Sequence, residues 1–493
     1  MGTKSSDAGL EYLAAYEARR MLDTGEISSV DLTRAVLQQI ERLEPILHSY
    51  VTVTVEKAVL QAEKADRRLR DGSQPRGPLT GVPVMIKDNI STAGVHTTAG
   101  SQMLKDYVPP YDASTVIRLR QQGAVIVGKG NMDEFAMGSS NENSAFEPTR
   151  NPWDRTRVPG GSSGGPAAGV AAGECAISLG SDTGGSIRQP AALCGVVGMK
   201  PTYGIVSRYG LIAFASSLDQ IGPLARNVRD CADTLDVIAG YDPLDSTSST
   251  KTTGLYSAVL GSDIKGMRFA VPREYLDQGT DPGVLGAFNK AISVLEDLGA
   301  VVGEISLPLT RHALAVYYII APAEASANLA RYDGFKYGFS DQGGPTAWDV
   351  MRDTRQRGFG DGVKRRILIG AYALSAGYYD AFYKKAQQVR TLIIQEFSEA
   401  FDNFDVLVTP TSPTVAFPFG ERVDDPMEMY KSDVLTIPVN IAGLPGISVP
   451  CGLSAGLPVG LQLIGPQFGD ATILKAAYAY EQATSWHTLR PNI

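Results

Sequence analysis

Apolar residues between residues 10 and 72 recur at the spacing of amphipathic helices. The periodic positions are Leu32, Val36, Leu37, Ile40 and Leu43. Ser28 and Asp31 have the spacing of a helix N-cap signal, and Gly25 and Gly72 are typical helix breaks. We therefore expect a helical layer over residues 1–72.

Short apolar runs follow, and helical patterns separate them. The runs at residues 82–86, 124–127 and 175–179 are typical of buried strands. Residues 115–122 and 164–173 have helical spacing. Alternating strands and helices predict an α/β protein with a layered sheet.

The second half of the chain continues this pattern after residues 242–261, a Ser- and Thr-rich segment typical of a loop. Residues 311–402 are expected to be mostly helical. The other expected elements are a helix over residues 281–298 and strands at residues 267–271, 301–305, 406–408, 447–449 and 459–463. No long linker marks a boundary, so we expect one domain, 1–493. It would comprise the helical layer, a core over residues 75–240 and a second part of the sheet over residues 241–493.

The composition is typical of a globular protein, since 43% of the 493 residues are hydrophobic and 20% are charged. The net charge of −8 does not give the positive field of a nucleic-acid-binding protein, so any RNA partner would be held mainly by another subunit.

The most apolar helix candidate, residues 313–323, contains Pro322 and precedes Glu324, which argues against a membrane span. No basic start precedes an apolar run, so we expect a cytoplasmic protein. The four widely spaced cysteines predict neither a disulfide framework nor a metal site.

Two glycine-rich serine motifs and one lysine are the strongest candidates for chemistry. Residues 160–165 are Gly-Gly-Ser-Ser-Gly-Gly, residues 181–190 are Ser-Asp-Thr-Gly-Gly-Ser-Ile-Arg-Gln-Pro, and Lys87 ends an apolar run. A hydroxyl attacks an amide only where a base removes its proton and donors stabilise the oxyanion. The sequence has four histidines, His48, His96, His312 and His487, and none lies beside a serine in a Gly-x-Ser-x-Gly motif. A Ser-His-Asp triad is therefore poorly supported. A lysine base is therefore the natural replacement for histidine.

Lys87 must be largely uncharged to act as a base. Unperturbed lysine has a pKa of about 10.4, so near neutral pH its pKa must fall by roughly three, which corresponds to about 4 kcal/mol. Burial can supply this change, and alternation along the strand sends the charge of Asp88 to the opposite face. Taken alone, a lysine snorkelling at a strand end is the simpler interpretation.

Each glycine motif also has a simpler interpretation. Residues 160–165 could be an anion cradle before a helix, although they lack the spacing of a P-loop or a dinucleotide site. Gly184, Gly185 and Ser186 could form a strand-to-helix turn capped by the serine. The combination of both motifs with Lys87 favours catalysis.

Together these residues resemble the amidase signature family. The matching motifs are G-G-S-S-G-G, S-D-T-G-G-S-I-R-Q-P and C-G-V-V-G-M-K-P-T, with fitting separations between the candidate residues. The resemblance implies a layered α/β/α fold with a central mixed sheet and a Ser-cis-Ser-Lys triad. Ser186 would be the nucleophile, Ser162 the relay after a cis peptide, and Lys87 the base. The backbone N–H groups that would form the oxyanion hole are those of Thr183, Gly184, Gly185 and Ser186.

The resemblance covers nearly the whole chain and is strongest to one branch of the family, the glutaminase subunits of tRNA-dependent amidotransferases. The segments that carry it are residues 317–334, 363–370 and 429–436. In that branch the positions matching Tyr317, Arg366 and Asp433 hold glutamine. A guanidinium suits the carboxylate of a free amino acid, and a carboxylate suits its ammonium group. Alternatively, Arg365 faces the site instead of Arg366, or these charges are simply solvated.

The resemblance implies that the chain hydrolyses free glutamine to glutamate and ammonia as one member of a heterotrimer with subunits B and C. The B subunit would use this ammonia, with ATP and Mg²⁺, to amidate mischarged Glu-tRNA(Gln) or Asp-tRNA(Asn), and the small C subunit would complete the assembly. No cofactor or metal is expected in this chain. The rival interpretations are a stand-alone amidase acting on a small or aryl amide, and a non-catalytic scaffold or nucleotide-binding subunit that holds an anion at residues 160–165.

Overall fold

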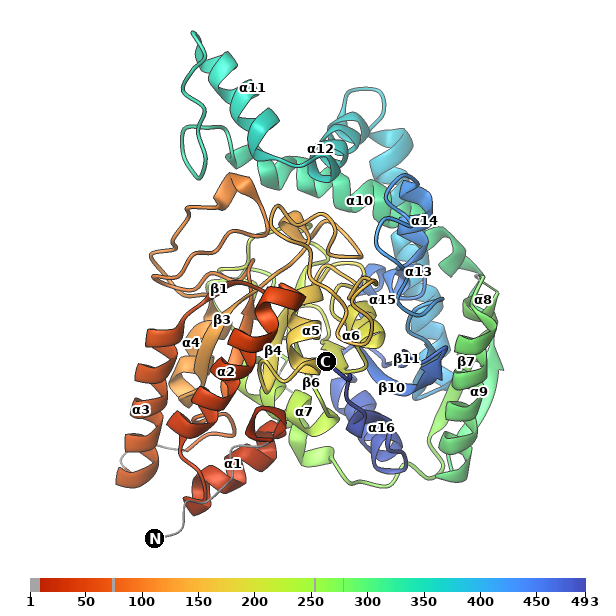
Figure 1. Ribbon diagram of the computed structural model, residues 1–493. Coiled ribbons are helices and arrows are strands. Elements are labelled where there is room, and N and C mark those ends of the chain that lie inside the picture. Colours follow the sequence, from red (N-terminus) through yellow and green to blue (C-terminus); the bar gives the residue numbers. More distant parts are fainter. Residues whose placement is uncertain (1–8, 73–75, 252–253, 278) are drawn as a thin grey trace.

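The computed structural model describes residues 9–72, 76–251, 254–277 and 279–493. Residues 1–8 of the predicted helical layer, residue 75 of the predicted core and residues 252–253 of the predicted loop lie outside the described residues. In the described part of the chain, eleven strands form one sheet in the order β1-β3-β2-β4-β6-β5-β10-β11-β9-β7-β8 (Figure 1). The sheet mixes parallel and antiparallel pairs, so the predicted α/β fold with a mixed sheet is confirmed.

The strands of this sheet come from both halves of the chain. The pairs β2–β3, β2–β4, β7–β8 and β7–β9 are parallel, and the other neighbours are antiparallel. The strand bounds are β1 Tyr50–Val53, β2 Pro83–Lys87, β3 Val125–Gly130, β4 Ile177–Asp182, β5 Val197–Lys200, β6 Gln220–Ala225, β7 Arg268–Pro272, β8 Val301–Ile305, β9 Val406–Pro410, β10 Gly446–Ser454 and β11 Leu457–Ile464.

The helices cover the sheet and extend beyond one end of it. Their bounds are α1 Ala15–Thr24, α2 Ser29–Leu47, α3 Val55–Asp71, α4 Ser114–Gln122, α5 Gly164–Ala171, α6 Arg188–Cys194, α7 Val228–Ile238, α8 Arg273–Leu276, α9 Pro282–Asp297, α10 Ala313–Asn328, α11 Ala347–Gly358, α12 Asp361–Leu374, α13 Lys385–Asn403, α14 Pro426–Lys431, α15 Ile437–Ile441 and α16 Asp470–Gln482. The predicted N-cap is present, since Ser28 Oγ accepts from the Asp31 N–H at 3.0 Å before α2.

Side chains along β2 alternate between two cores. Val84 and Ile86 belong to the core that includes α4, α7, α9 and α16. Met85 belongs to the opposite core, which includes α2, α3, α5 and α6. Because side chains alternate along a strand, Lys87 lies on the Met85 side, toward α5 and the loop before it.

The segment predicted to be mostly helical, residues 311–402, forms α10 to α13, and this prediction is confirmed. Of these helices, α10, α12 and α13 share a third core with α15 and strand β9, through residues such as Val363, Phe397 and Leu407. Figure 1 shows α10, α11 and α12 together at the top of the view, across one end of the sheet.

The predicted N-terminal layer is wrong at Tyr50–Val53, which is strand β1 paired antiparallel with β3. This Tyr-Val-Thr-Val segment is rich in the aromatic and β-branched residues that favour strands. Strands β5 and β6 were also not predicted. Strand β6 contains Gly222 and Pro223, residue types that are depleted in strands, so its local sequence does not suggest a strand.

No helix within the described ranges has the length and apolar character needed to cross a membrane. The four cysteines, Cys175, Cys194, Cys231 and Cys451, are buried free thiols. Their wide spacing in the sequence predicted that they would not form a disulfide framework.

Candidate active site

Lys87 is the last residue of β2, and its side chain is completely buried. Its Nζ lies 2.7 Å from Ser162 Oγ, 2.8 Å from Ser163 Oγ and 3.1 Å from the Ser181 carbonyl oxygen. The structure therefore brings together the lysine and the first serine that the sequence analysis selected. It also places a second hydroxyl against the same amine.

Burial lowers the pKa of the Lys87 amine to about 7. The neighbouring Asp88 does not oppose this change at close range, because it points to the other side and lies 3.6 Å from Lys129. The predicted separation of Lys87 from Asp88 is therefore present. The carboxylates whose charges act against the effect of burial are those of Asp133, Asp182 and Asp219. About half of a population with a pKa of 7 is free amine at neutral pH.

Ser162 and Ser163 lie in the loop before α5, and the Gly161–Ser162 peptide is cis, as the family resemblance implied. The Gly161 N–H donates to Gln189 Oε1 at 3.0 Å, and the Ser163 N–H donates to the Ser186 carbonyl at 3.1 Å. These bonds fix the loop against the second serine motif. Ser163 was not a predicted site residue, although the doubled serine of Gly-Gly-Ser-Ser-Gly-Gly was a signal that could have found it.

Ser186 lies in the turn between β4 and α6 and is 6% exposed. The Gly185 N–H in this turn donates to Asp182 Oδ1 at 2.8 Å. It therefore already has a carboxylate acceptor in this structure, and its predicted part in an oxyanion hole stays a prediction. The N–H groups of Thr183, Gly184 and Ser186 have no acceptor among the described residues, so these three remain candidates.

A buried ion pair supports this turn, residues 183–187, which is called the nucleophile turn after the role predicted for Ser186. Arg188 Nε lies 3.1 Å from Asp182 Oδ2, and the guanidinium also donates to Gln462 at 2.7 Å and to Asn440 at 2.5 Å. Burial by itself would raise the pKa of Asp182, but the Arg188 guanidinium lowers it to about 2. The Asp182 carboxylate therefore stays charged and continues to accept from the turn.

Tyr317 of α10 and Arg366 of α12 are each 6% exposed. A Cβ atom at Gly184 would come within 2.8 Å of Tyr317 Cζ, so the tyrosine ring packs directly on the nucleophile turn. Arg366 Cζ lies 5.8 Å from the centre of the Tyr430 ring, whereas Arg365 is exposed. The structure thus distinguishes the two arginines and places Arg366 on the inner side of α12.

Asp433 lies just after α14 and is 6% exposed. Its Oδ2 accepts from the Ser139 hydroxyl, whereas its Oδ1 has no hydrogen-bond partner within the described ranges. A Cβ atom at Gly185 would lie 3.4 Å from this Oδ1, which places the carboxyl beside the nucleophile turn. Burial raises the pKa of Asp433 to about 8. Sequence reasoning missed Ser139, which no motif brought to notice.

Ser186 Oγ makes no hydrogen bond with the described residues, so the bond between the Ser186 and Ser162 hydroxyls stays a prediction. Among the described residues, no group of three or more His, Cys, Asp or Glu is arranged to hold a metal ion. The site combines a weakly basic amine, buried serines, backbone donors, a guanidinium and a carboxyl group. Such a set can hydrolyse an amide in a molecule that also carries a carboxylate and an ammonium group.

Comparison with known proteins identifies relatives over almost the whole chain. The profile of the family described as Amidase matches residues 31–474. The glutamyl-tRNA(Gln) amidotransferase A subunit of Carboxydothermus hydrogenoformans is 58% identical over 484 residues, which cover 98% of this chain and 100% of the relative.

Two solved structures show how far the likeness extends. The glutamyl-tRNA(Gln) amidotransferase A subunit of Thermotoga maritima is 43% identical with a TM-score of 0.76, covering 97% of this chain and 94% of that chain. The peptide amidase of Stenotrophomonas maltophilia is 32% identical with a TM-score of 0.83, covering 99% of both chains. The fold is therefore shared with proteins whose names indicate different amide substrates.

Proposed function

This chain belongs to the amidase family, and from that membership and the geometry of its site we propose that it is the glutamine-hydrolysing subunit of a tRNA-dependent amidotransferase. The proposal has two parts. The first is the Ser-Ser-Lys mechanism of amide hydrolysis, and the second is free glutamine as the substrate.

In the proposed mechanism, Ser186 Oγ attacks the side-chain amide carbon of glutamine. Its proton passes to Ser162 Oγ while the Ser162 proton passes to Lys87 Nζ, which lies 2.7 Å away. The pKa of about 7 supports this role, because the amine is then often free to accept a proton near neutral pH. The N–H groups of Thr183 and Gly184 stabilise the oxyanion together with that of the nucleophile itself.

The tetrahedral intermediate then collapses, and the carbon–nitrogen bond breaks. Lys87 returns its proton through Ser162 to the leaving nitrogen, so ammonia departs and a glutamyl ester remains on Ser186. Water attacks this ester with the same two residues moving its proton, and glutamate leaves. The enzyme ends each cycle in its starting protonation state, so no cofactor is required in this chain.

The observation that carries the choice of substrate is that Asp433 lies beside the nucleophile turn, while the Arg366 guanidinium is near enough to influence Tyr317, which packs on that turn. We propose that the unpartnered Oδ1 of Asp433 pairs with the α-ammonium group of the substrate and that the Arg366 guanidinium pairs with its α-carboxylate. Tyr317 packs against Gly184 and closes the site beside the nucleophile. A free amino acid with a side-chain amide matches these groups.

The relatives named as A subunits of glutamyl-tRNA(Gln) amidotransferases suggest the setting of this reaction. We propose that ammonia passes to a B subunit, which uses ATP and Mg²⁺ to activate the glutamyl group of Glu-tRNA(Gln), or the aspartyl group of Asp-tRNA(Asn). A small C subunit completes the heterotrimer, and the tRNA is held mainly by the B subunit in the cytoplasm. The net charge of −8 supports this division, since this chain contributes little positive field for RNA.

Ammonia release from glutamine by the purified chain, alone and with subunits B and C, tests the proposal. We expect weak release by the chain alone, faster release in the complex and none from Ser186→Ala. Wild-type rates in the Ser186→Ala variant would refute the mechanism. An unlabelled Ser186 after treatment with an acylating inhibitor would instead favour a non-catalytic scaffold.

The second candidate is a stand-alone amidase for a small or aryl amide. It is favoured by the likeness to the peptide amidase of Stenotrophomonas maltophilia. Faster hydrolysis of aryl or peptide amides than of glutamine, with no response to subunits B and C, would select this candidate.

A further inference from the structure

A pocket lies at the opposite end of strands β4 and β6 from the nucleophile turn. Strands β4 and β6 run antiparallel, so that Asp182 pairs with Gln220 and Ile177 pairs with Ala225. Arg226 follows Ala225 and lines this pocket. At about 3.3 Å per residue, the length of β4 separates the two sites by roughly 16 Å.

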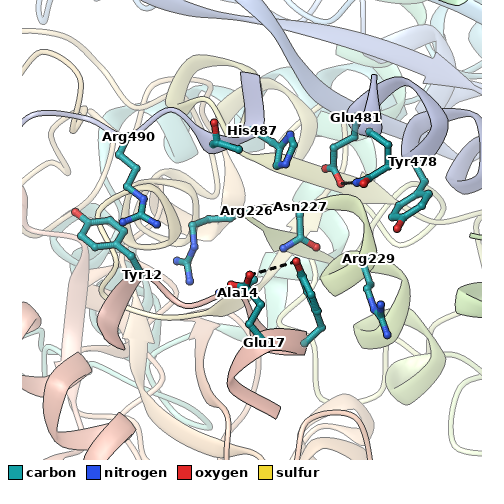
Figure 2. Close-up of a pocket in the computed structure, with 13 residues that line it drawn as sticks. Tyr12, Ala14, Glu17, Arg226, Asn227, Arg229, Tyr478, Glu481, His487 and Arg490 are labelled. Carbon is teal, nitrogen blue, oxygen red and sulfur yellow. Dashed lines mark hydrogen bonds between the residues drawn. The ribbon is translucent and has the colours of Figure 1, made fainter. Parts of the chain in front are cut away.

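The pocket joins segments from both ends of the described chain and has a volume of about 420 Å³. Its walls come from η1 (Leu10–Tyr12), the start of α1, the start of α7, the end of α16 and the C-terminal segment with η8 (Trp486–Thr488). Figure 2 shows Arg490 and Arg226 beside Tyr12 on one side and Arg229 on the other. This volume lies within the range of small-molecule sites.

The arginine side chains are held in a way that leaves donors available. Arg490 Cζ lies 4.5 Å from the centre of the Tyr12 ring, and Arg229 Cζ lies 4.9 Å from that of Tyr16. Stacking occupies the face of a guanidinium, whereas its N–H groups point outward in the plane. Within the described ranges neither arginine donates a hydrogen bond, and the shortest ion pair of Arg229 is 3.8 Å to Asp233.

Arg226 adds a third cation that is fixed in place. Its guanidinium donates to the carbonyl groups of Val170 and Cys175 at 3.1 Å each, and to that of Leu13. It makes no ion pair with a carboxylate in the described part of the chain, although Asp230 lies near enough to influence its pKa. Arg490 is also near enough to repel it. An anion between these two arginines would relieve that repulsion.

The acidic side chains of the pocket do not neutralise the three arginines. Glu17 accepts from the Ala14 N–H at 3.2 Å, and Glu481 accepts from the Val228 N–H at 2.7 Å. Burial raises the pKa of Glu481 to about 8, so this carboxyl is mostly uncharged at neutral pH. Burial also lowers the pKa of His487. The lining thus has three guanidinium groups against the carboxyl groups of Glu17 and Glu481, while Asp233 and Asp230 lie outside the lining beside Arg229 and Arg226. The lining itself therefore has more cationic than acidic side chains, which suits an anion.

We propose that this pocket is a binding site for an organic phosphate, with the phosphoryl group between Arg490 and Arg226 and with Arg229 on the opposite wall. A phosphate monoester carries a charge of about −1.5 to −2 at neutral pH, which favours a site lined by arginines. Its oxygens accept paired N–H groups from a guanidinium fork. The site is separate from amide hydrolysis and uses none of its residues.

Calorimetric titration of the full chain with inorganic phosphate, AMP, adenosine and succinate tests the assignment. We expect one saturable site for phosphate and AMP, weakening with added salt, and at least tenfold weaker binding of adenosine and succinate. Arg490→Gln and Arg229→Gln should each weaken AMP binding about tenfold, since a charge-assisted hydrogen bond corresponds to such a factor or more. Both arginines are exposed, so these variants should retain folding and amide hydrolysis.

Arg352→Gln is a matched control, because this exposed arginine lies on α11 with Asp349 and Asp353. It should bind AMP as the wild type does. The proposal is overturned by an absence of saturable binding, or by AMP affinity that is unchanged in both pocket variants. Equal binding of succinate or adenosine would also overturn it, because the site would then not recognise the phosphoryl group.

Discussion

Glutamine binding should release a proton from Asp433, and this prediction follows from the partners of its carboxyl group. One oxygen accepts from Ser139, the other has no partner in the described part of the chain, and burial raises the pKa to about 8. An ammonium group beside this carboxyl favours its ionised form, so binding should lower the pKa. Affinity must therefore rise as the pH rises from 6 to 8.

The magnitude follows from the pKa of the free site. With a pKa of about 8, about 1% of the carboxyl groups are ionised at pH 6 and about half at pH 8. Apparent affinity scales with the binding-competent fraction, so the Kd for glutamine should be about 50-fold higher at pH 6 than at pH 8. At pH 7 binding should release about 0.9 protons per glutamine.

Calorimetry of the Ser186→Ala variant measures both quantities without turnover. Titration in buffers with different ionisation enthalpies gives the number of protons released, and titrations at pH 6, 7 and 8 give the affinity. Asp433→Asn should abolish proton release and weaken binding about 100-fold or more, since the ammonium group loses its charge partner. The exposed Asp424→Asn is the matched control and should behave as the parent does. A Kd that does not change between pH 6 and 8, with no proton released, would refute the assigned role of Asp433.

Three further predictions concern the catalytic amine and the nucleophile turn. Lys87→Arg should lower kcat for glutamine about 1,000-fold or more, as Lys87→Ala should, because a guanidinium group stays charged. Wild-type kcat should rise as the pH increases through about 7, the pKa of Lys87. An active arginine variant in steady-state assays would contradict a neutral amine base. In urea unfolding, Arg188→Met should lower the free energy of unfolding by about 3–5 kcal/mol, because it leaves Asp182 buried without its partner. The control Arg352→Met, at an exposed position of α11, should lower it by under about 1 kcal/mol. Equal losses would show that the buried ion pair does not stabilise the turn. Gly185→Ala should lower kcat about 100-fold or more, because φ of Gly185 is 143° and the new methyl group would overlap Thr436. The control Gly286→Ala in α9 places its methyl group in open space and should retain full activity. An active Gly185→Ala enzyme would show that the turn tolerates a side chain.

Local sequence predicted the elements whose composition agrees with their final surroundings. The apolar run at residues 82–86 became β2, and the alternation that separates Val84 from Met85 also placed Lys87 opposite Asp88. Strand β6 was missed because its Gly222 and Pro223 do not favour a strand. Its pairing with β4 on one side and β5 on the other overrides that preference.

The candidate site residues also divide into those that sequence motifs identify and those that only the fold brings together. Lys87, Ser162 and Ser186 were identified because they lie in motifs, and the structure places the first two at hydrogen-bond distance. Ser139 could not be identified, since its contact with Asp433 joins residues 294 positions apart. The commitment of the Gly185 N–H to Asp182 likewise depends on how the turn folds, which the order of residues does not reveal.

The ion pair behind the nucleophile has a consequence for how the enzyme is made. Arg188 is held by Asn440 and Gln462, so the turn that contains Ser186 is completed by residues 252 and 274 positions later in the chain than Arg188, which are synthesised after it. A nascent chain that stalls before Asn440 contains Lys87, Ser162 and Ser186 but lacks this support. Under the proposed function, chains truncated before Asn440 should therefore be unable to hydrolyse glutamine.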